Sequence, residues 1–253
     1  MIWKLIVIGM AGYLLGSVNL SIVLSKLMGK GDIREHGSGN AGTTNTLRVL
    51  GPLPAILVLA FDVFKGFLAI KISHWLMLLG AASIPANDLV ISFEYANLIA
   101  AFGVIMGHNF PIYYGFKGGK GIATSLGVLL TLEWEIGLIC LLFALVLILS
   151  SRMVSLGSIF AAFLYPVLVA VIGNEYGTEL KYKLPYFFFA CCIALLAIAR
   201  HRKNISRLLS GTENKLWKTK KEKAAIEAEK VAKAIANDQA KIAEATTKDE
   251  EAK

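Results

Sequence analysis

The chain has 253 residues, of which 56% are hydrophobic and only 17% are charged, and its mean hydropathy is +0.61. An ordinary soluble protein carries about 25% charged residues. The composition argues against a soluble enzyme and against a disordered chain, and it favours a protein that crosses a membrane several times. The net charge is +8, and residues 214–253 hold ten Lys against eight Asp and Glu, so most of the surplus lies in the apolar body. Such a surplus is typical of cytoplasmic loops or of sites for anionic substrates.

Seven apolar segments follow one another in this body. A membrane-spanning helix needs about 20 mostly apolar residues at a rise of about 1.5 Å each. The candidates are residues 5–25, 53–78, 95–116, 121–132, 136–151, 153–174 and 184–199. Residues 121–132 are short for a span, and we expect flanking residues or neighbouring helices to complete it.

Charged residues alternate from loop to loop. The first, third and fifth loops and the end of the last helix carry Lys and Arg, the second and fourth carry Asp and Glu, and the sixth balances both signs. Basic loops tend to face the cytoplasm. We therefore predict an all-α polytopic membrane protein with about seven transmembrane helices, its N-terminus outside and its C-terminus cytoplasmic. Without residues 121–132 the alternation would fail.

Residues 214–253 differ in composition from the transmembrane domain predicted for residues 1–213. They are rich in Ala, Lys and Glu and contain neither Gly nor Pro. This composition favours helix, but there is no heptad of large apolar residues. We expect a cytoplasmic tail that is partly helical or disordered. An alternative role is contact with acidic lipid headgroups through Lys215, Lys218, Lys220, Lys221 and Lys223.

The first loop concentrates small polar residues beside a membrane helix. Three glycines within residues 37–42 let backbone amides approach a ligand closely. Neutral hydrogen-bonding groups and one forked cation suited to phosphate are supplied by Ser38, Asn40, Thr43, Thr44, Asn45 and Arg48. A flexible loop would use the same turn-forming residues, but their density favours a binding site.

The third loop brings glycines and lysines to the start of a helix. It contains Gly107-His108-Asn109-Phe110-Pro111, then Lys117 and the turn Gly118-Gly119-Lys120-Gly121. The free amides and the dipole of a helix N-terminus attract anions. The turn is not a Walker A loop, because Gly121 stands where Ser or Thr is required. An alternative is a pair of lysines that extend to the membrane surface from a helix end.

Two residue pairs lie on single helical faces. Asp62 and Lys65 are three positions apart within an apolar segment, where charges often mark a functional site. A mutually neutralised structural pair fits them equally well. Ser155 and Ser158 have the same spacing, and they are either polar groups of a site or small residues for helix packing.

A basic string, Arg200-His201-Arg202-Lys203-Asn204, follows the last apolar segment. Alone, it would suggest a cytoplasmic anchor. In the predicted topology, however, this string, the first and third loops and residues 152–158 all lie at the cytoplasmic face. Cations, glycines and hydroxyls gathered on one face suit a ligand with more than one phosphate and an apolar tail.

Together these motifs resemble the bacterial acyl-phosphate:glycerol-3-phosphate acyltransferases, the PlsY family. The resemblance is carried by residues 37–45, 62–66, 107–121 and 200–204, and it covers about residues 1–213 in matching order. It implies a multi-pass enzyme of the bacterial cell membrane whose active site faces the cytoplasm. That enzyme would move an acyl group from acyl phosphate to the 1-position of sn-glycerol 3-phosphate. No cofactor, metal or nucleic acid is implied, and we expect a monomer in contact with membrane lipids. The tail departs from the family pattern.

The resemblance also implies roles for individual residues. Ser38, Arg48, Lys120, His201 and Asn204 resemble the groups that hold two phosphates, and the turn of Gly118, Gly119, Lys120 and Gly121 resembles an acyl-phosphate cradle. We add Asn40, Thr44, Asn45 and Ser158 as neighbouring hydrogen-bonding groups. The expected supporting residues are Asp62, Lys65, His108, Lys117 and Ser155.

The sequence also limits the chemistry. Ala41, Leu79, Tyr113 and Ser206 stand five positions after the four histidines, so the His–Asp dyad of soluble glycerolipid acyltransferases is absent. His201 is the remaining candidate base. The resemblance implies a substrate-assisted route in which the phosphate of glycerol 3-phosphate takes the proton. The alternative function is a membrane transporter of an organic phosphate, whose site would lie near the midplane between internal repeats. No such repeat is found.

Overall fold

The computed structural model describes residues 2–79, 86–172 and 180–217, with side chains from residue 93 in the second range and from residue 184 in the third. Every regular element in these residues is helical. The α-helices are α1 (Ile2–Ser17), α2 (Leu20–Leu27), α3 (Thr43–Leu50), α4 (Pro52–Leu78), α5 (Ala86–Asn109), α6 (Ile122–Leu132), α7 (Trp134–Ser151), α8 (Val154–Ile172), α9 (Leu180–Arg200) and α10 (Arg202–Leu209). Two short 3-10 turns, η1 (Ile33–Glu35) and η3 (Ile112–Tyr114), lie in loops.

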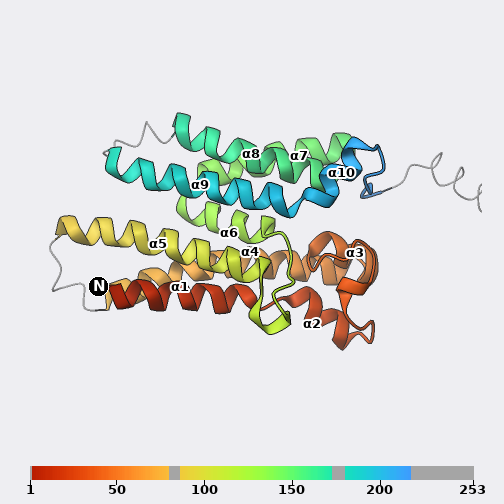
Figure 1. The fold of residues 1–253 in the computed structure, drawn as a ribbon, viewed down its shortest axis with the longest axis horizontal. Coiled ribbons are helices and arrows are strands. Elements are labelled where there is room, and N and C mark those ends of the chain that lie inside the picture. The colour runs from red at the N-terminus through yellow and green to blue at the C-terminus, as the bar shows by residue number, and fades with distance from the viewer. Residues whose placement is uncertain (1, 80–85, 173–179, 218–253) are drawn as a thin grey trace, which may run out of the picture. The chain divides into compact units, whose positions relative to one another are not determined.

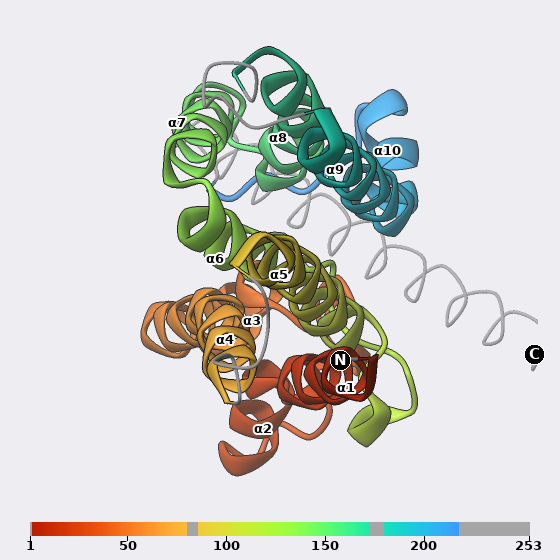
Figure 2. The ribbon, with the colours of Figure 1, turned by 90° about the vertical axis from the view of Figure 1, so that its left-hand side faces the viewer.

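The long helices form two groups within one compact unit, Met1–Asn214. Helix α5 packs on α1 and α4, while α8 packs on α7 and α9. Short α6 contacts both α4 and α7 and so joins the groups, as the end-on view shows (Figure 2). Helices α2, α3 and α10 gather at one end of the bundle (Figure 1). Segments far apart in sequence therefore meet at that end.

Four spans among the described residues are long and apolar enough to cross a membrane. They are α1 with α2, α4, α7 and α8, and the bent pair of α9 and α10 becomes a fifth if it counts as one span. Helix α6 is apolar but has only 11 residues. The all-helical membrane fold is thus found, whereas seven crossings and the orientation of the termini stay predictions. The predicted tail lies outside the described residues beyond position 217.

Several helix ends differ from the predicted segments. The first segment breaks after Ser17, because the Asn19 side chain accepts a hydrogen bond from the amide of Ile22 and starts a new helix. Helix α5 stops at Asn109, well before the predicted end at position 116, since Pro111 lacks the amide that would continue it. Helices α3 and α10 were not predicted, and α10 turns by 61° from α9.

Glycines let the helices around the site approach closely. A β-carbon at Gly12 would lie 2.8 Å from the carbonyl oxygen of Ala100, and one at Gly103 would lie 2.6 Å from that of Gly9. Such contacts between small residues replace the hydrophobic drive that is missing in lipid. Gly127 brings α6 equally close to the backbone of Val63 in α4. Helix α5 is thereby packed closely on α1, and α6 on α4.

Candidate active site

The loop after α2 (residues 28–42, loop one) and the loop after α5 (residues 110–121, loop three) touch at the end of the bundle that holds α10 (Figure 1). The Arg34 guanidinium pairs with Asp32 at 2.6 Å and donates to the carbonyl oxygens of Tyr114 (2.7 Å) and Lys117 (2.9 Å). These hydrogen bonds hold the two polar loops side by side. The sequence predicted both loops on one membrane face.

Asn45 determines the shape of loop one. Its amide nitrogen donates to the carbonyls of Ile33 (3.1 Å) and His36 (3.0 Å), and its Oδ1 accepts the amide of Ser38 at 2.7 Å. The side chain is only 1% exposed. Gly37 has φ +61° and leaves no room for a β-carbon beside this side chain. Asn45 therefore holds the loop from within, and its polar atoms are already engaged.

Helix α3 begins directly after the glycine-rich part of loop one. Ser38, Asn40 and Thr44 are half-buried around its first turn, and Arg48 is exposed one turn later. The charges of Glu213 and Arg207 act on the Arg48 guanidinium, so this cation lies close to the C-terminal part of the site.

The glycine turn of loop three uses its backbone in an unexpected way. The amides of Gly118 and Gly119 donate to the carbonyl oxygens of Asn109 (3.2 Å) and His108 (3.1 Å) at the end of α5. A β-carbon at Gly119 would overlap the His108 ring and lie 2.7 Å from the carbonyl oxygen of Ala41. These two glycines allow close packing, and their amides are already hydrogen-bonded to α5. In the predicted phosphate cradle, the backbone amides that remain are those of Lys120 and Gly121.

A buried cluster of charged residues lies next to the glycine turn of loop three. Lys65 forms an ion pair with Asp62 at 2.8 Å and lies 2.9 Å from Nδ1 of His108, and all three side chains are at most 5% exposed. Lys65 also donates to the carbonyls of Gly16 and Val18 at the break between α1 and α2. Asp62 and Lys65 thus tie three helices together, and His108 connects them to the turn.

Glu213 is the centre of a polar network that joins loop three to the C-terminal segment. The Lys120 ammonium donates to Oδ1 of Asn204 at 2.5 Å, and the Asn204 amide donates to Glu213 at 2.8 Å. Ser155 Oγ and Arg207 Nε donate to the same carboxylate at 3.0 and 2.9 Å. The Glu213 side chain is only 4% exposed. Three regions of the chain therefore meet around one carboxylate.

Burial changes the protonation of two groups in this site. It lowers the pKa of Lys120 to about 8, although the nearby charge of Glu213 opposes the change. It lowers the pKa of His201 to about 4, with the Lys120 charge acting in the same direction. Nδ1 of His201 lies 2.7 Å from the carbonyl oxygen of Ala197 and must donate to it. At neutral pH the ring is uncharged, and Nε2 is an acceptor.

The structure brings most of the predicted residues to this end of the bundle, but with different surroundings. Ser158 is buried and donates to the carbonyl of Val154 at 2.9 Å, one turn from Ser155. The Lys117 side chain is exposed, and its carbonyl is held by Arg34. Within the described residues, no group of three or more His, Cys, Asp or Glu side chains is placed to hold a metal ion.

Sequence reasoning missed three residues. Arg34 and Arg200 hold backbone carbonyls of loop three, and Glu213 gathers the donors of the C-terminal segment. A carboxylate that follows a run of cations was the available signal for Glu213. Arg200 lies in the basic string that the sequence singled out, but the roles of the two arginines could not be predicted, since their partners are carbonyls about 80 positions away.

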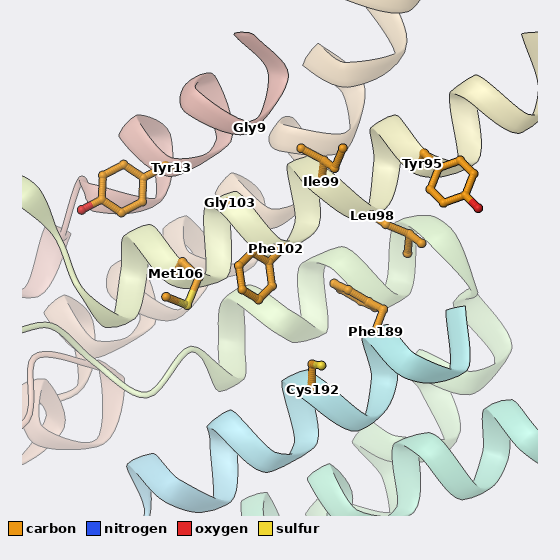
Figure 3. Close-up of a pocket in the computed structure, with 10 residues that line it drawn as sticks. All are labelled: Gly9, Tyr13, Tyr95, Leu98, Ile99, Phe102, Gly103, Met106, Phe189 and Cys192. Atoms are coloured by element: carbon orange, nitrogen blue, oxygen red, sulfur yellow. The ribbon is translucent and has the colours of Figure 1, made fainter. Parts of the chain in front are cut away.

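An apolar groove of about 500 Å³ lies between α1, α5 and α9. Leu98, Phe102 and Met106 of α5 face Phe189 and Cys192 of α9 across it (Figure 3). Tyr13 lines the groove and donates to the carbonyl oxygen of Phe110 in loop three at 2.8 Å. The groove therefore runs along the same two helices that lead into the polar site.

These features define a helical integral membrane protein with a cationic, hydroxyl-bearing site at one end and an apolar groove beside it. The sequence profile of the glycerol-3-phosphate acyltransferase family matches residues 6–211. The glycerol-3-phosphate acyltransferase of Halalkalibacterium halodurans is 45% identical over 216 residues, which cover 85% of this chain and 96% of that protein. The glycerol-3-phosphate acyltransferase of Clostridioides difficile is 36% identical over 219 residues, which cover 87% of this chain and 98% of that protein.

Solved structures agree with this assignment. The crystal structure of PlsY, an integral membrane glycerol 3-phosphate acyltransferase, in its glycerol 3-phosphate form superposes with a TM-score of 0.70 at 34% identity, covering 83% of this chain and 94% of that one. Its lysophosphatidic acid form gives a TM-score of 0.67 with the same coverage. The chain belongs to the glycerol-3-phosphate acyltransferase family.

Proposed function

We propose that this protein transfers an acyl group from acyl phosphate to the 1-position of sn-glycerol 3-phosphate, producing lysophosphatidic acid and inorganic phosphate. The observation that carries the proposal is a polar chain in which Lys120 donates to Asn204, while Asn204 and Ser155 donate to the Glu213 carboxylate. An ammonium, an amide and a hydroxyl placed this close together are the kinds of donor that suit phosphate oxygens. The similarity to PlsY, solved in glycerol 3-phosphate and lysophosphatidic acid forms, supports both substrate and product.

The two phosphates are held by groups from both sides of the site. Lys120 and Arg48 supply the positive charge, while Ser38, Asn204 and Ser158 supply hydrogen bonds. Asn40, Thr44 and the amides of Lys120 and Gly121 add neutral donors near the starts of α3 and α6. Helix starts of this kind favour anions. Asn45, Asp62, Lys65, His108, Lys117 and Ser155 support these groups.

The acyl chain lies in the groove between α5 and α9. Both helices continue from the groove into the polar site, α5 toward Phe110 and α9 toward Arg200. Eight residues separate Cys192 from Arg200, which is about 12 Å along a helix. A chain whose carbonyl lies beside Lys120 would therefore pass Cys192 part of the way along its length. The groove opens on its side, so a lipid substrate enters from the bilayer.

The reaction needs no covalent enzyme intermediate, because acyl phosphate is already activated. The hydroxyl oxygen on carbon 1 of glycerol 3-phosphate attacks the acyl carbonyl carbon, the bond from that carbon to the phosphate oxygen breaks, and inorganic phosphate leaves. The hydroxyl proton passes to the phosphate of glycerol 3-phosphate, whose second pKa of about 6 suits this role at neutral pH. The protein contributes position and positive charge.

His201 orients the nucleophile in this route. With a pKa of about 4, its ring holds a proton poorly at neutral pH. Its Nε2 nevertheless accepts a hydrogen bond, because Nδ1 is committed to Ala197. His201 thus accepts a hydrogen bond from the glycerol hydroxyl and orients its oxygen toward the acyl carbonyl carbon, while the substrate phosphate takes the proton.

The protein spans the bacterial cell membrane with seven helical segments and works as a monomer. Its N-terminus is outside, and the active site and the C-terminal tail are in the cytoplasm. The alternation of basic and acidic loops supports this orientation, and the gathering of α2, α3 and α10 at one end supports a single polar face.

Phosphate release by the purified full chain tests the proposal. The protein is mixed with glycerol 3-phosphate and with acyl phosphate, acyl-CoA or acyl-loaded acyl carrier protein as donor, and the product is identified by mass. We expect lysophosphatidic acid only when acyl phosphate is the donor, and a severe but measurable reduction in Lys120→Gln. Activity only with acyl-CoA would overturn the donor assignment. Uptake of glycerol 3-phosphate into protein-containing vesicles without product would instead support the transporter.

A further inference from the structure

Arg200, the last residue of α9, binds the glycine turn of loop three through its guanidinium group. Nη2 donates to the carbonyl oxygens of Gly119 (2.8 Å) and Gly118 (3.2 Å), and Nε donates to Gly119 as well (3.1 Å). The guanidinium carbon lies 5.1 Å from the centre of the Phe110 ring. The side chain is thus held by two carbonyls and one aromatic face, an arrangement that suits the planar fork of arginine.

The turn is held from its other side by α5. The amides of Gly118 and Gly119 donate to Asn109 and His108, while the carbonyls of the same two residues accept from Arg200. Both polar sides of these peptide groups are therefore engaged. Because the glycines have no side chains, the turn packs at close range on His108 and Asn109 of α5 and on Ala41 of loop one.

The residues next to this contact are those proposed to act on substrate. Lys120 directly follows Gly119, and His201 directly follows Arg200. The Lys120 ammonium reaches Asn204, one turn beyond His201, at 2.5 Å. Contacts between α5 and α9 are few compared with those inside each helix group. The Arg200 hydrogen bonds therefore set the distance between the two halves of the site.

We propose that Arg200 is a positioning residue for the acyl transfer reaction: it holds the Gly118-Gly119 turn so that the Lys120 ammonium lies beside Asn204 and His201. It acts through Lys120 and does not itself contact substrate, and this inference rests on the proposed role of Lys120. A displacement of about 1 Å at such a site can cost about 100-fold in rate.

A double-mutant cycle with Arg200→Gln and Lys120→Gln tests the inference in the full chain. We expect Arg200→Gln to lower kcat/KM about 100-fold. The double variant should be no worse than Lys120→Gln alone, because a residue that acts through Lys120 has nothing left to position. Arg200→Lys should recover part of the activity, since one ammonium can satisfy one carbonyl. Arg202→Gln, an exposed arginine two positions on, is the matched control and should retain full activity.

Three outcomes are decisive. If the losses in kcat/KM of the two single variants multiply in the double variant, Arg200 binds substrate directly. If Arg200→Gln is fully active, the turn does not need the Arg200 hydrogen bonds to hold its position. Either result overturns the inference while Lys120→Gln is still severely impaired, so the proposed function survives. Full activity of Lys120→Gln would instead remove the proposed function and this inference with it. The melting temperature in detergent checks that Arg200→Lys remains folded.

Discussion

The ammonium of Lys120 and the amide oxygen of Asn204 lie 2.5 Å apart, although 84 positions separate the two residues in sequence. One comes from the loop before α6 and the other from α10, so this contact joins the two helix groups. Neither residue is exposed: Asn204 is 8% accessible and Lys120 is half-buried. A lysine in this setting loses its proton more easily than one in water.

The Michaelis constant for glycerol 3-phosphate should rise about tenfold between pH 7 and pH 9. The pKa of Lys120 is about 8, so the ammonium is present below that pH and is lost above it. The substrate phosphate is almost fully ionised throughout this range and adds little change of its own. Lys120→Arg should remove the rise, and Lys203→Ala, an exposed lysine on α10, should keep it. A rise that persists in Lys120→Arg would assign the titration to another group.

His201→Gln should retain more activity than His201→Ala, because glutamine can still accept a hydrogen bond from the glycerol hydroxyl. The pKa of His201 is about 4, so its titration falls well below the physiological range. A break in kcat/KM near pH 6 should come from the substrate phosphate and should persist in His201→Gln. If both variants are equally inactive, or if the break disappears with the histidine, His201 is the general base. Rates measured from pH 4.5 to 8 decide this.

Glu213→Gln should shift the alkaline rise of KM to lower pH. The Glu213 charge supports the protonated form of Lys120, so its removal lowers the pKa of Lys120 further below 8. The variant also leaves Arg207 without its carboxylate partner, and we expect about 1–3 kcal/mol less stability. Glu35→Gln, at an exposed position in loop one, is the control. A shift toward higher pH would contradict the electrostatic coupling, and unchanged stability would contradict the network.

Lys65→Met should destabilise the protein by about 3–5 kcal/mol, because it leaves the Asp62 carboxylate buried without its ion-pair partner. Asp62→Leu should cost a similar amount for the converse reason. The double variant should be more stable than either single variant, since no uncompensated charge remains. Unfolding in mild detergent, followed by helical signal and residual activity, measures all three. Additive losses would show that each residue contributes through other contacts, such as those of Lys65 with Gly16 and Val18.

Cys192→Trp should shift the acyl preference toward shorter chains, because the indole would fill the groove beside Phe189. Leu195→Trp is a matched control on the same helix, since Leu195 is 67% exposed and does not line the groove. A second readout is the labelling of Cys192 by an alkyl maleimide, which a long-chain acyl phosphate should slow. Equal chain-length profiles in both tryptophan variants would show that the acyl chain lies elsewhere.

Parts of the site could be predicted because their signal is local. The three-residue spacing of Asp62 and Lys65 put both charges on one face of a helix, and they form the 2.8 Å pair. The glycine-rich motifs of loops one and three identified the polar end of the bundle. Arg34 escaped prediction because its carbonyl partners lie about 80 positions away. The local signal for Glu213 was overlooked, and its contact with Ser155, 58 positions away, could not be predicted from the sequence. Asn45 and Gly119 were predicted as substrate-binding groups, and the sequence could not show that the Asn45 side chain and the Gly119 amide are hydrogen-bonded within the protein.

The sequence by itself determined that this chain is a helical membrane protein of the acyltransferase family. Apolar segments of sufficient length must become helices in lipid, since only helices satisfy their own backbone hydrogen bonds there. The tertiary structure alone decided which polar groups are free and which are engaged. Loop three gives its glycine amides to α5 and its carbonyls to Arg200, while the Lys120 ammonium extends to Asn204 in the C-terminal segment, where we propose that the substrate binds. Hydrogen bonds between distant segments form only after the helices have packed, and local sequence patterns do not encode them.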